Sequence, residues 1–257
     1  MAADYIDYIV ADRVLIPVEN QTFYSEKIVY LPDSYQVNDA NRKISDRVFS
    51  RMELQLPQDG FVFCCFNNSY KILPSMFDGW MRILKSVPGS VIWLLEDNAT
   101  SVANLKREAS SRGVSPDRLV FARRMPLADH LARHRCADLF LDTLPCNAHT
   151  TASDALWAGL PVLTQIGESF AARVAASLLT ALGLPELITT SAEDYEHSAI
   201  KLATDPQALQ RLKQRLADNR LSSTLFDTSV YVKQIEAAYR AMHARHQSGL
   251  APDHITI

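Results

Sequence analysis

The feature that most constrains the fold is a strand–turn–helix–strand pattern between residues 139 and 164. An apolar run at 139–141 leads into a polar turn, and a helix is predicted to begin at residues 149–151. The sequence Gly159-Leu160-Pro161 ends that helix before a second apolar run at 162–164. This order is typical of a βαβ unit, in which ligands bind where the first strand ends and the helix begins.

The start of this helix has the composition of a phosphate site. Free backbone N–H groups at a helix N-terminus bind anions, and the hydroxyls of Thr150 and Thr151 lie beside them. Asp154 follows one turn later, within reach of a ribose hydroxyl. A threonine N-cap with an acid in the first turn explains the same residues without a ligand. The segment alone leaves both interpretations open.

The alternation of strands and helices extends over most of the chain. Strands are predicted at 61–66, 91–95, 119–121, 139–141, 162–164 and, as the last one, 187–188. Helices are predicted at 73–87, 99–112, 127–135, 149–158 and 169–182, followed by three closing helices at 192–203, 206–221 and 228–247. This rhythm predicts an α/β fold with a parallel, doubly wound sheet and a C-terminal helical segment.

The first 57 residues have a different pattern. They contain two short strand-like runs at 5–10 and 26–31, followed by a polar stretch at 33–58 with Pro32 and Pro57 at its ends. Two isolated strands do not form a stable sheet in water, so we expect this segment to be the tail of another domain. The predicted division is residues 1–57 and residues 58–257.

Composition excludes several function classes. The 257 residues include 26 basic and 29 acidic side chains, and a net charge of −3 argues against a general nucleic-acid binder. No apolar run approaches the ~18–20 residues that span a bilayer, and no signal peptide is evident. The four cysteines lack CxxC spacing, which indicates reduced thiols. The sequence has no D-x-D triplet, the carboxylate pair that would indicate a divalent metal. We therefore expect a cytoplasmic protein without a metal or membrane contact.

Four polar clusters follow predicted strands, at 67–71, 123–133, 149–154 and 167–173. Each has an ordinary explanation as a solvated turn, a solvated basic face, a helix cap or a structural arginine. Residues 118–135 nevertheless hold five arginines and one acid, which suits an anionic ligand. The sequence has no G-x-G-x-x-G, P-loop or G-x-S-x-G motif. Together, the clusters predict a nucleotide-diphosphate site at one rim of the sheet.

Several of these segments resemble a known family. The segments at 66–72, 91–95, 146–151, 154–161 and 173–177 together resemble the C-terminal catalytic lobe of O-linked N-acetylglucosamine transferases. These enzymes form glycosyltransferase family 41, which includes the SPINDLY-like plant enzymes. Residues 24–32 resemble the end of the family's N-terminal lobe. The resemblance implies a GT-B-type fold, with two Rossmann-like lobes and the sugar nucleotide mainly on the C-terminal one.

The resemblance also implies roles for individual residues. Lys71 is similar to the family's catalytic lysine, which neutralises the diphosphate. The other implied donor-binding residues are Asn68 near the phosphates; Arg124, Met125 and Pro126 through their backbone, with His130 and Arg133, at the uracil; His149, Thr150 and Thr151 at the β-phosphate; and Asp154 at the ribose. Leu127 departs from the pattern, because animal members carry a lysine there.

The function that the resemblance implies is transfer of N-acetylglucosamine from UDP-GlcNAc to serine or threonine of proteins, without a tightly bound cofactor. The family's acceptor groove and tetratricopeptide repeats belong to segments upstream of Met1, so we expect this chain to be the donor-binding lobe. Two alternatives stay open: a non-catalytic nucleotide-sugar-binding module that needs a partner lobe, and a GT-B enzyme similar to UDP-GlcNAc epimerases. GlcNAc, fucose and glucose are all compatible donor sugars.

Overall fold

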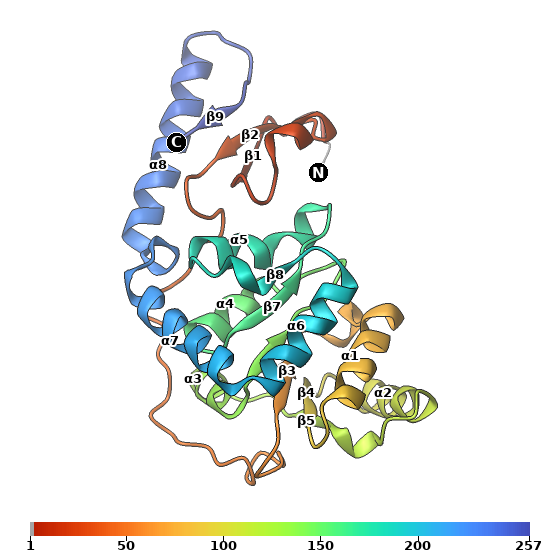
Figure 1. Ribbon diagram of the computed structural model, residues 1–257. Helices are drawn as coiled ribbons and strands as arrows, with labels where there is room; N and C mark the ends of the chain where they lie inside the picture. Colours follow the sequence, from red (N-terminus) through yellow and green to blue (C-terminus); the bar gives the residue numbers. More distant parts are fainter. Residues whose placement is uncertain (1–2) are drawn as a thin grey trace.

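The computed structural model describes residues 3–257, in which the strands form two parallel sheets (Figure 1). The larger sheet has the order β5-β4-β3-β6-β7-β8. Its strands are β3 (Val62–Cys65), β4 (Val91–Leu95), β5 (Leu119–Ala122), β6 (Leu139–Leu141), β7 (Val162–Gln165) and β8 (Ile188–Thr189). Every pair is parallel, and the order reverses between β3 and β6. The predicted doubly wound α/β fold is therefore confirmed.

The two strands at the reversal point form the centre of the core. All residues of β3 and β6 are buried, whereas Val120 and Phe121 of the edge strand β5 are only half-buried. Helices cover both faces of the central strands, so these strands need apolar side chains at every position instead of at alternate ones. This explains the continuous apolar run at 61–66.

Helices lie on both faces of this sheet. They are α1 (Pro74–Ser86), α2 (Ala99–Ser111), α3 (Leu127–Arg133), α4 (Thr150–Trp157), α5 (Val174–Ala181), α6 (Ala192–Thr204) and α7 (Pro206–Ser222), whereas α8 (Thr228–Gln247) runs on to the small sheet. Helix α1 packs against α6, whereas α4 packs against α3, α5 and α7. At the end of α4, Gly159 adopts φ +86°, and Leu160 N–H donates to Ala155 O at 2.8 Å. Glycine suits this left-handed position because it has no Cβ.

One predicted helix was wrong at its start. The helix expected at 169–182 begins only at Val174, after a separate 3₁₀ turn, Phe170–Ala172. Arg173 has φ −125° and ψ −5°, which interrupts the helical path. Its guanidinium donates to Val14 O at 2.6 Å and Gly167 O at 2.8 Å. These long-range contacts fix the loop and override the local helical preference.

The smaller sheet contains β1 (Tyr8–Ala11), β2 (Lys27–Tyr30) and β9 (Ile255–Thr256), in the order β1-β2-β9. The two N-terminal strands were predicted, but the expectation that residues 187–188 form the last strand was wrong. In β9, Ile255 pairs with Val29, and the backbone N–H of Ile28 donates to His254 Nδ1 at 2.9 Å. A two-residue strand has almost no local signal, so only its partner reveals it.

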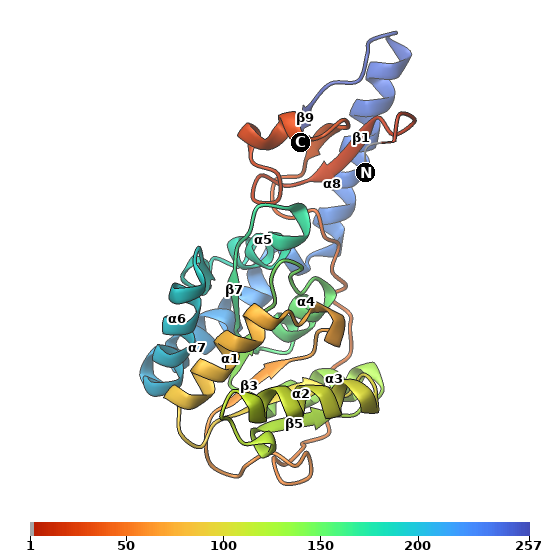
Figure 2. The same cartoon turned by 90° about the vertical axis from the view of Figure 1, so that its right-hand side faces the viewer.

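Helix α8 connects the large sheet's helices to the small sheet (Figure 2). Its buried Ala238 packs with Val29 and Leu31, and the half-buried side chains around this contact include Ile235 and Met242. These helix residues recur at the spacing of one helical face. The apolar face of α8 therefore covers β2 and completes a small second core.

The small sheet also contacts the large lobe through a buried carboxylate. Asp12 is 2% exposed and accepts hydrogen bonds from Ser177 Oγ at 2.6 Å and from the backbone N–H groups of Val14, Leu15 and Tyr35. Because Ser177 belongs to α5, these bonds hold the β1 segment against that helix. None of the helices within residues 3–257 is long and apolar enough to cross a membrane.

Candidate functional site

Polar loops that follow β3, β6 and β7 meet at one rim of the large sheet. Asn67, after β3, donates from Nδ2 to Thr143 Oγ1 at 2.8 Å, after β6. Asn147 N–H donates to Ala171 O at 2.8 Å, after β7. The ring of His130, from α3 after β5, lies 5.1 Å from that of Phe66. The structure thus brings the four predicted clusters together at the strand order reversal.

Lys71 joins the two loops that flank the reversal point. It ends a 3₁₀ turn, Ser69–Lys71, directly after β3, and its side chain is half-buried. Its Nζ donates to Asn147 O at 2.7 Å, in the turn that precedes α4. Asn68, the residue before the 3₁₀ turn, is also half-buried, and its carbonyl accepts from Lys71 N–H at 3.0 Å. An ammonium group is therefore held beside the start of α4.

The N-terminus of α4 carries a partial positive charge and lies beside this ammonium group. Thr150 is exposed, while Thr151 Oγ1 donates to Asn67 Oδ1, so the two hydroxyls are not equivalent. The first N–H groups of a helix have no helical acceptor. His149 precedes the helix; its Nε2 contacts Ala171 O at 3.3 Å, and burial lowers the pKa of its imidazole.

The turn between β6 and α4 is built around Asp142, which sequence reasoning missed. This carboxylate is 1% exposed and accepts from Thr143 N–H at 2.7 Å, Ala148 N–H at 2.6 Å and Thr164 Oγ1 at 2.7 Å. Burial raises the pKa of Asp142 to about 6, although the hydrogen bonds and Lys71 act in the opposite direction. The buried acceptor gives the turn its shape.

Next to Phe66, an arginine fixes the protonation of His130. Arg133 is 1% exposed; it donates to Arg123 O at 2.6 Å and, because guanidinium only donates, to His130 Nδ1 at 2.6 Å. The proton of the neutral His130 ring is therefore on Nε2. Burial, followed by electrostatic interactions with His134 and Arg133, lowers the pKa of His130 to about 3. The ring is a neutral Nε2–H donor at physiological pH.

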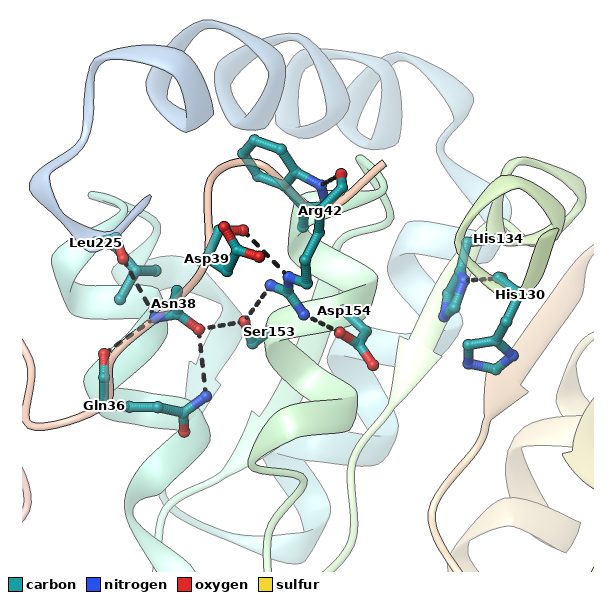
Figure 3. Close-up of polar contacts among 10 residues, drawn as sticks. Gln36, Asn38, Asp39, Arg42, His130, His134, Ser153, Asp154 and Leu225 are labelled. Carbon is teal, nitrogen blue, oxygen red and sulfur yellow. Dashed lines mark hydrogen bonds and ion pairs between the residues drawn. The ribbon is translucent and has the colours of Figure 1, made fainter. Parts of the chain in front are cut away.

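Behind this ring, His134 is also neutral and completes the cluster. Its Nδ1 donates to the backbone carbonyl of His130 at 2.8 Å, as Figure 3 shows. Burial lowers the pKa of His134 to about 4. The His134 side chain is 1% exposed, so it does not reach the surface. Its hydrogen bond holds the backbone of His130 from the interior of the protein.

The loop after β5 places the remaining predicted residues. Arg124 is exposed and lies 3.4 Å from Asp97, a carboxylate that also accepts from Ser69 Oγ at 2.8 Å. Met125 is half-buried against the core, and Pro126 directly precedes α3. This loop therefore closes one end of the rim, while the exposed Leu127 begins α3 beside it.

Asp154 is not free in this structure. It is 7% exposed, and its Oδ1 forms an ion pair with Arg42 from the loop between the two sheets (Figure 3). Burial raises the pKa of Asp154, and Arg42 opposes this shift. Sequence reasoning placed Asp154 in the first turns of the helix but gave no reason to select Arg42. Arg42 also contacts Ser153 on α4, and 111 residues separate the two in sequence.

The rim combines positive groups with a neutral ring donor. Lys71 and the N-terminus of α4 suit an anion, and His130 suits the edge or face of a base. Within residues 3–257, no group of three or more His, Cys, Asp or Glu side chains is arranged to hold a metal ion. This combination of groups is suited to an anionic ligand that also carries an aromatic base.

The chain is similar to several known proteins. The sequence is 41% identical over 261 residues to an Arabidopsis thaliana protein named as a probable UDP-N-acetylglucosamine–peptide N-acetylglucosaminyltransferase SEC. The alignment covers 99% of this chain and 27% of that protein. The sequence is 42% identical over 207 residues to the Caenorhabditis elegans UDP-N-acetylglucosamine–peptide N-acetylglucosaminyltransferase, with coverage of 80% and 18%. The chain thus spans about a quarter or less of the length of these curated relatives.

A solved structure and a family model extend the match. A mutant O-GlcNAc transferase from Thermobaculum terrenum superposes with a TM-score of 0.80 at 32% identity, covering 92% of this chain and 45% of that one. This bears out the predicted GT-B-type fold. The sequence model of glycosyl transferase family 41 matches residues 1–49 and 41–235. The resemblance inferred from the motifs is confirmed, and the chain belongs to glycosyl transferase family 41.

Proposed function

We propose that this chain binds the donor of a protein O-GlcNAc transferase, which transfers N-acetylglucosamine from UDP-GlcNAc to serine or threonine. The observation that carries the proposal is the hydrogen bond from Lys71 Nζ to Asn147 O, at 2.7 Å. It holds a cation at the strand reversal, beside a helix N-terminus, where doubly wound sheets bind nucleotides. The names of the relatives supply the donor, UDP-GlcNAc, and the peptide acceptor.

In this proposal the diphosphate lies between Lys71 and the start of α4. The N–H groups of Thr150 and Thr151 and the side chain of His149 face the β-phosphate, and Asn68 lies on the Lys71 side. Thr150 is exposed and its hydroxyl can donate to a phosphate oxygen. The hydroxyl of Thr151 already donates to Asn67, so its backbone N–H is the better donor.

The nucleoside extends toward α3. Uracil lies against the backbone of Arg124, Met125 and Pro126, with the Nε2–H of His130 directed at a base carbonyl. Arg133 supports this ring by holding its Nδ1 as an acceptor. Asp154 accepts from the ribose hydroxyls.

The proposed chemistry uses the protein's own positive potential and needs no metal. The acceptor hydroxyl oxygen attacks C1 of the sugar, its proton leaves to a base, and the bond from C1 to the β-phosphate oxygen breaks with its electron pair going to UDP. Lys71 and the helix dipole stabilise the charge that develops on the diphosphate. These groups lower the barrier only if the diphosphate lies at the β3–β6 reversal.

The proposal divides the chain into two parts. We propose that residues 58–257 are the UDP-sugar-binding lobe and that residues 1–57 belong to the N-terminal catalytic lobe and its linker. Strands β1 and β2 lie outside the six-stranded sheet, which supports this division, and α8 and β9 return from the C-terminal part to pack against them. The four free cysteines support a reducing compartment such as the cytoplasm.

Titration calorimetry with UDP tests the proposal, and a wild-type chain that does not bind UDP contradicts it. A second candidate is a binding module that acts only with a partner lobe. Turnover of UDP-GlcNAc with a peptide acceptor separates the two. Product formed by this chain alone supports the transferase. If the chain binds UDP but forms product only after a lobe with helical repeats is added, the result supports the module.

A further inference from the structure

Arg42 lies in the loop between β2 and β3 and forms a buried ion pair with α4. Its guanidinium pairs with Asp154 Oδ1, and the two side chains are only 13% and 9% exposed. The second terminal nitrogen donates to Ser153 Oγ at 3.0 Å. Figure 3 shows the guanidinium directed at both Ser153 and Asp154. Burial of both charges makes this pair different from the exposed ion pairs of the surface.

The loop around Arg42 is held in place by several further contacts. Ser153 Oγ also donates to Asn38 Oδ1, and Asn38 Nδ2 donates to Leu225 O at 3.2 Å. The indole N–H of Trp157 donates to Arg42 O at 3.0 Å. The guanidinium therefore has a fixed position relative to α4, and it fixes the carboxylate in turn.

The ion pair determines what Asp154 can offer a ligand. Burial raises the pKa of Asp154, and the charge and hydrogen bond of Arg42 act in the opposite direction. Arg42 takes Oδ1, while Oδ2 has no hydrogen-bond partner within the described part of the chain. An ionised carboxylate oxygen accepts stronger hydrogen bonds than a protonated one. One oxygen is thus anchored, and the other is left to accept from a ligand.

We propose that Arg42 is a positioning residue that makes Asp154 a selective acceptor for a ribose hydroxyl, and so a determinant of ribose over deoxyribose donors. The inference rests on the proposed function, because it takes a nucleoside diphosphate as the ligand. Arg42 itself does not touch the ligand. Without it, the carboxylate loses its ion-pair partner and its fixed rotamer, and the preference for the hydroxyl is lost with them.

Competitive calorimetry with UDP, 2′-deoxy-UDP and 3′-deoxy-UDP tests this role. The wild-type chain is expected to bind UDP about 10- to 100-fold more tightly than the analogue that lacks the contacted hydroxyl, as expected for a hydrogen bond to a charged group. In Arg42→Gln the ratio is expected to fall below about threefold, as it does in Asp154→Asn. Arg42→Lys retains the charge and keeps part of the ratio. The matched control, Lys43→Gln, changes the exposed neighbouring residue and leaves the ratio unchanged.

The ratio distinguishes positioning from a general role in folding. If Arg42 only holds the loop, Arg42→Gln weakens UDP and both analogues by the same factor, and the proposal is overturned. Equal wild-type affinities for all three ligands also overturn it, while leaving the proposed function intact. A wild-type chain that does not bind UDP removes the proposed function itself. Because each variant is its own reference, a partial loss of stability in Arg42→Gln does not obscure the ratio.

Discussion

Replacing Lys71 with methionine removes the charge at the strand reversal and keeps most of the side-chain volume. We expect UDP affinity to fall and uridine affinity to stay nearly the same, because the ammonium group faces the diphosphate and not the nucleoside. The variant also loses the hydrogen bond to Asn147 O, whose residue is fully buried. A lower melting temperature is therefore expected as well.

The size of the effect follows from the position of the lysine. Two unit charges about 4 Å apart interact by about 1 kcal/mol in bulk water and about 4 kcal/mol at the effective dielectric constant near a protein surface. Lys71 is half-buried, so its contribution falls between these values. The dissociation constant of UDP should rise by about 5- to 1,000-fold.

Calorimetry on Lys71→Met with UDP, UMP and uridine measures this directly, at low and at physiological salt. The control, Lys233→Met, removes an exposed lysine on α8 and should bind as the wild type does. Loss of affinity should be largest for UDP and smallest for uridine. Equal losses for all three ligands would refute the reasoning, because they would mean that the substitution only disturbs the fold.

Three further predictions concern the base, the pH dependence and the contact between the sheets. His130→Phe keeps an aromatic ring but loses the Nε2–H donor, so the affinities for uridine and UDP should fall by the same factor of about 2 to 10; a loss for UDP alone would contradict the assignment. Because burial lowers the pKa of His134 to about 4, the unfolded chain binds a proton between pH 6.5 and 4 that the folded chain does not. His134 should therefore lower the free energy of unfolding as the pH falls, by up to about 1.4 kcal/mol per pH unit, whereas Asp142, whose pKa burial raises, acts in the opposite direction. Urea unfolding at several pH values isolates the His134 contribution: relative to the wild type, His134→Asn should lose less stability as the pH falls, and an unchanged pH dependence would count against a buried neutral ring. Asp12→Ala leaves three backbone N–H groups and Ser177 Oγ without their acceptor, so urea unfolding should show a loss of about 3 kcal/mol or more. Ser177→Ala should cost only about 1 kcal/mol, and equal effects of the two variants would show that Asp12 does not hold the β1 segment.

Local patterns were sufficient for the large sheet and for the position of its rim. The run at 61–66 is apolar at every position because β3 is covered on both faces, and the capping and glycine signals marked most helix ends. The start at Val174 was the exception, since contacts of Arg173 break the helix. Its guanidinium donates to Val14, which is distant in sequence, and to Gly167, which lies before the helix. Side chains that follow parallel strands meet at one edge, so the four clusters could be predicted to converge.

Long-range partners could not be predicted in this way. Strand β9 has only two residues and exists because β2 offers it a free edge, 226 residues away in sequence. Asp142 and Arg42 are single charged residues whose importance depends on burial and on partners from other elements. The sequence shows the charge but neither its burial nor its partner. The residues that shape the site, unlike those that face it, thus become visible only in the folded chain.

A crystal structure of this chain with UDP tests the central claim most directly. The account predicts a β-phosphate within hydrogen-bond distance of Lys71 Nζ and of the first N–H groups of α4, with the uracil beside His130. Density for UDP at another place, such as the cleft between α6 and α7 lined by Lys201, Arg211 and Arg215, would contradict it.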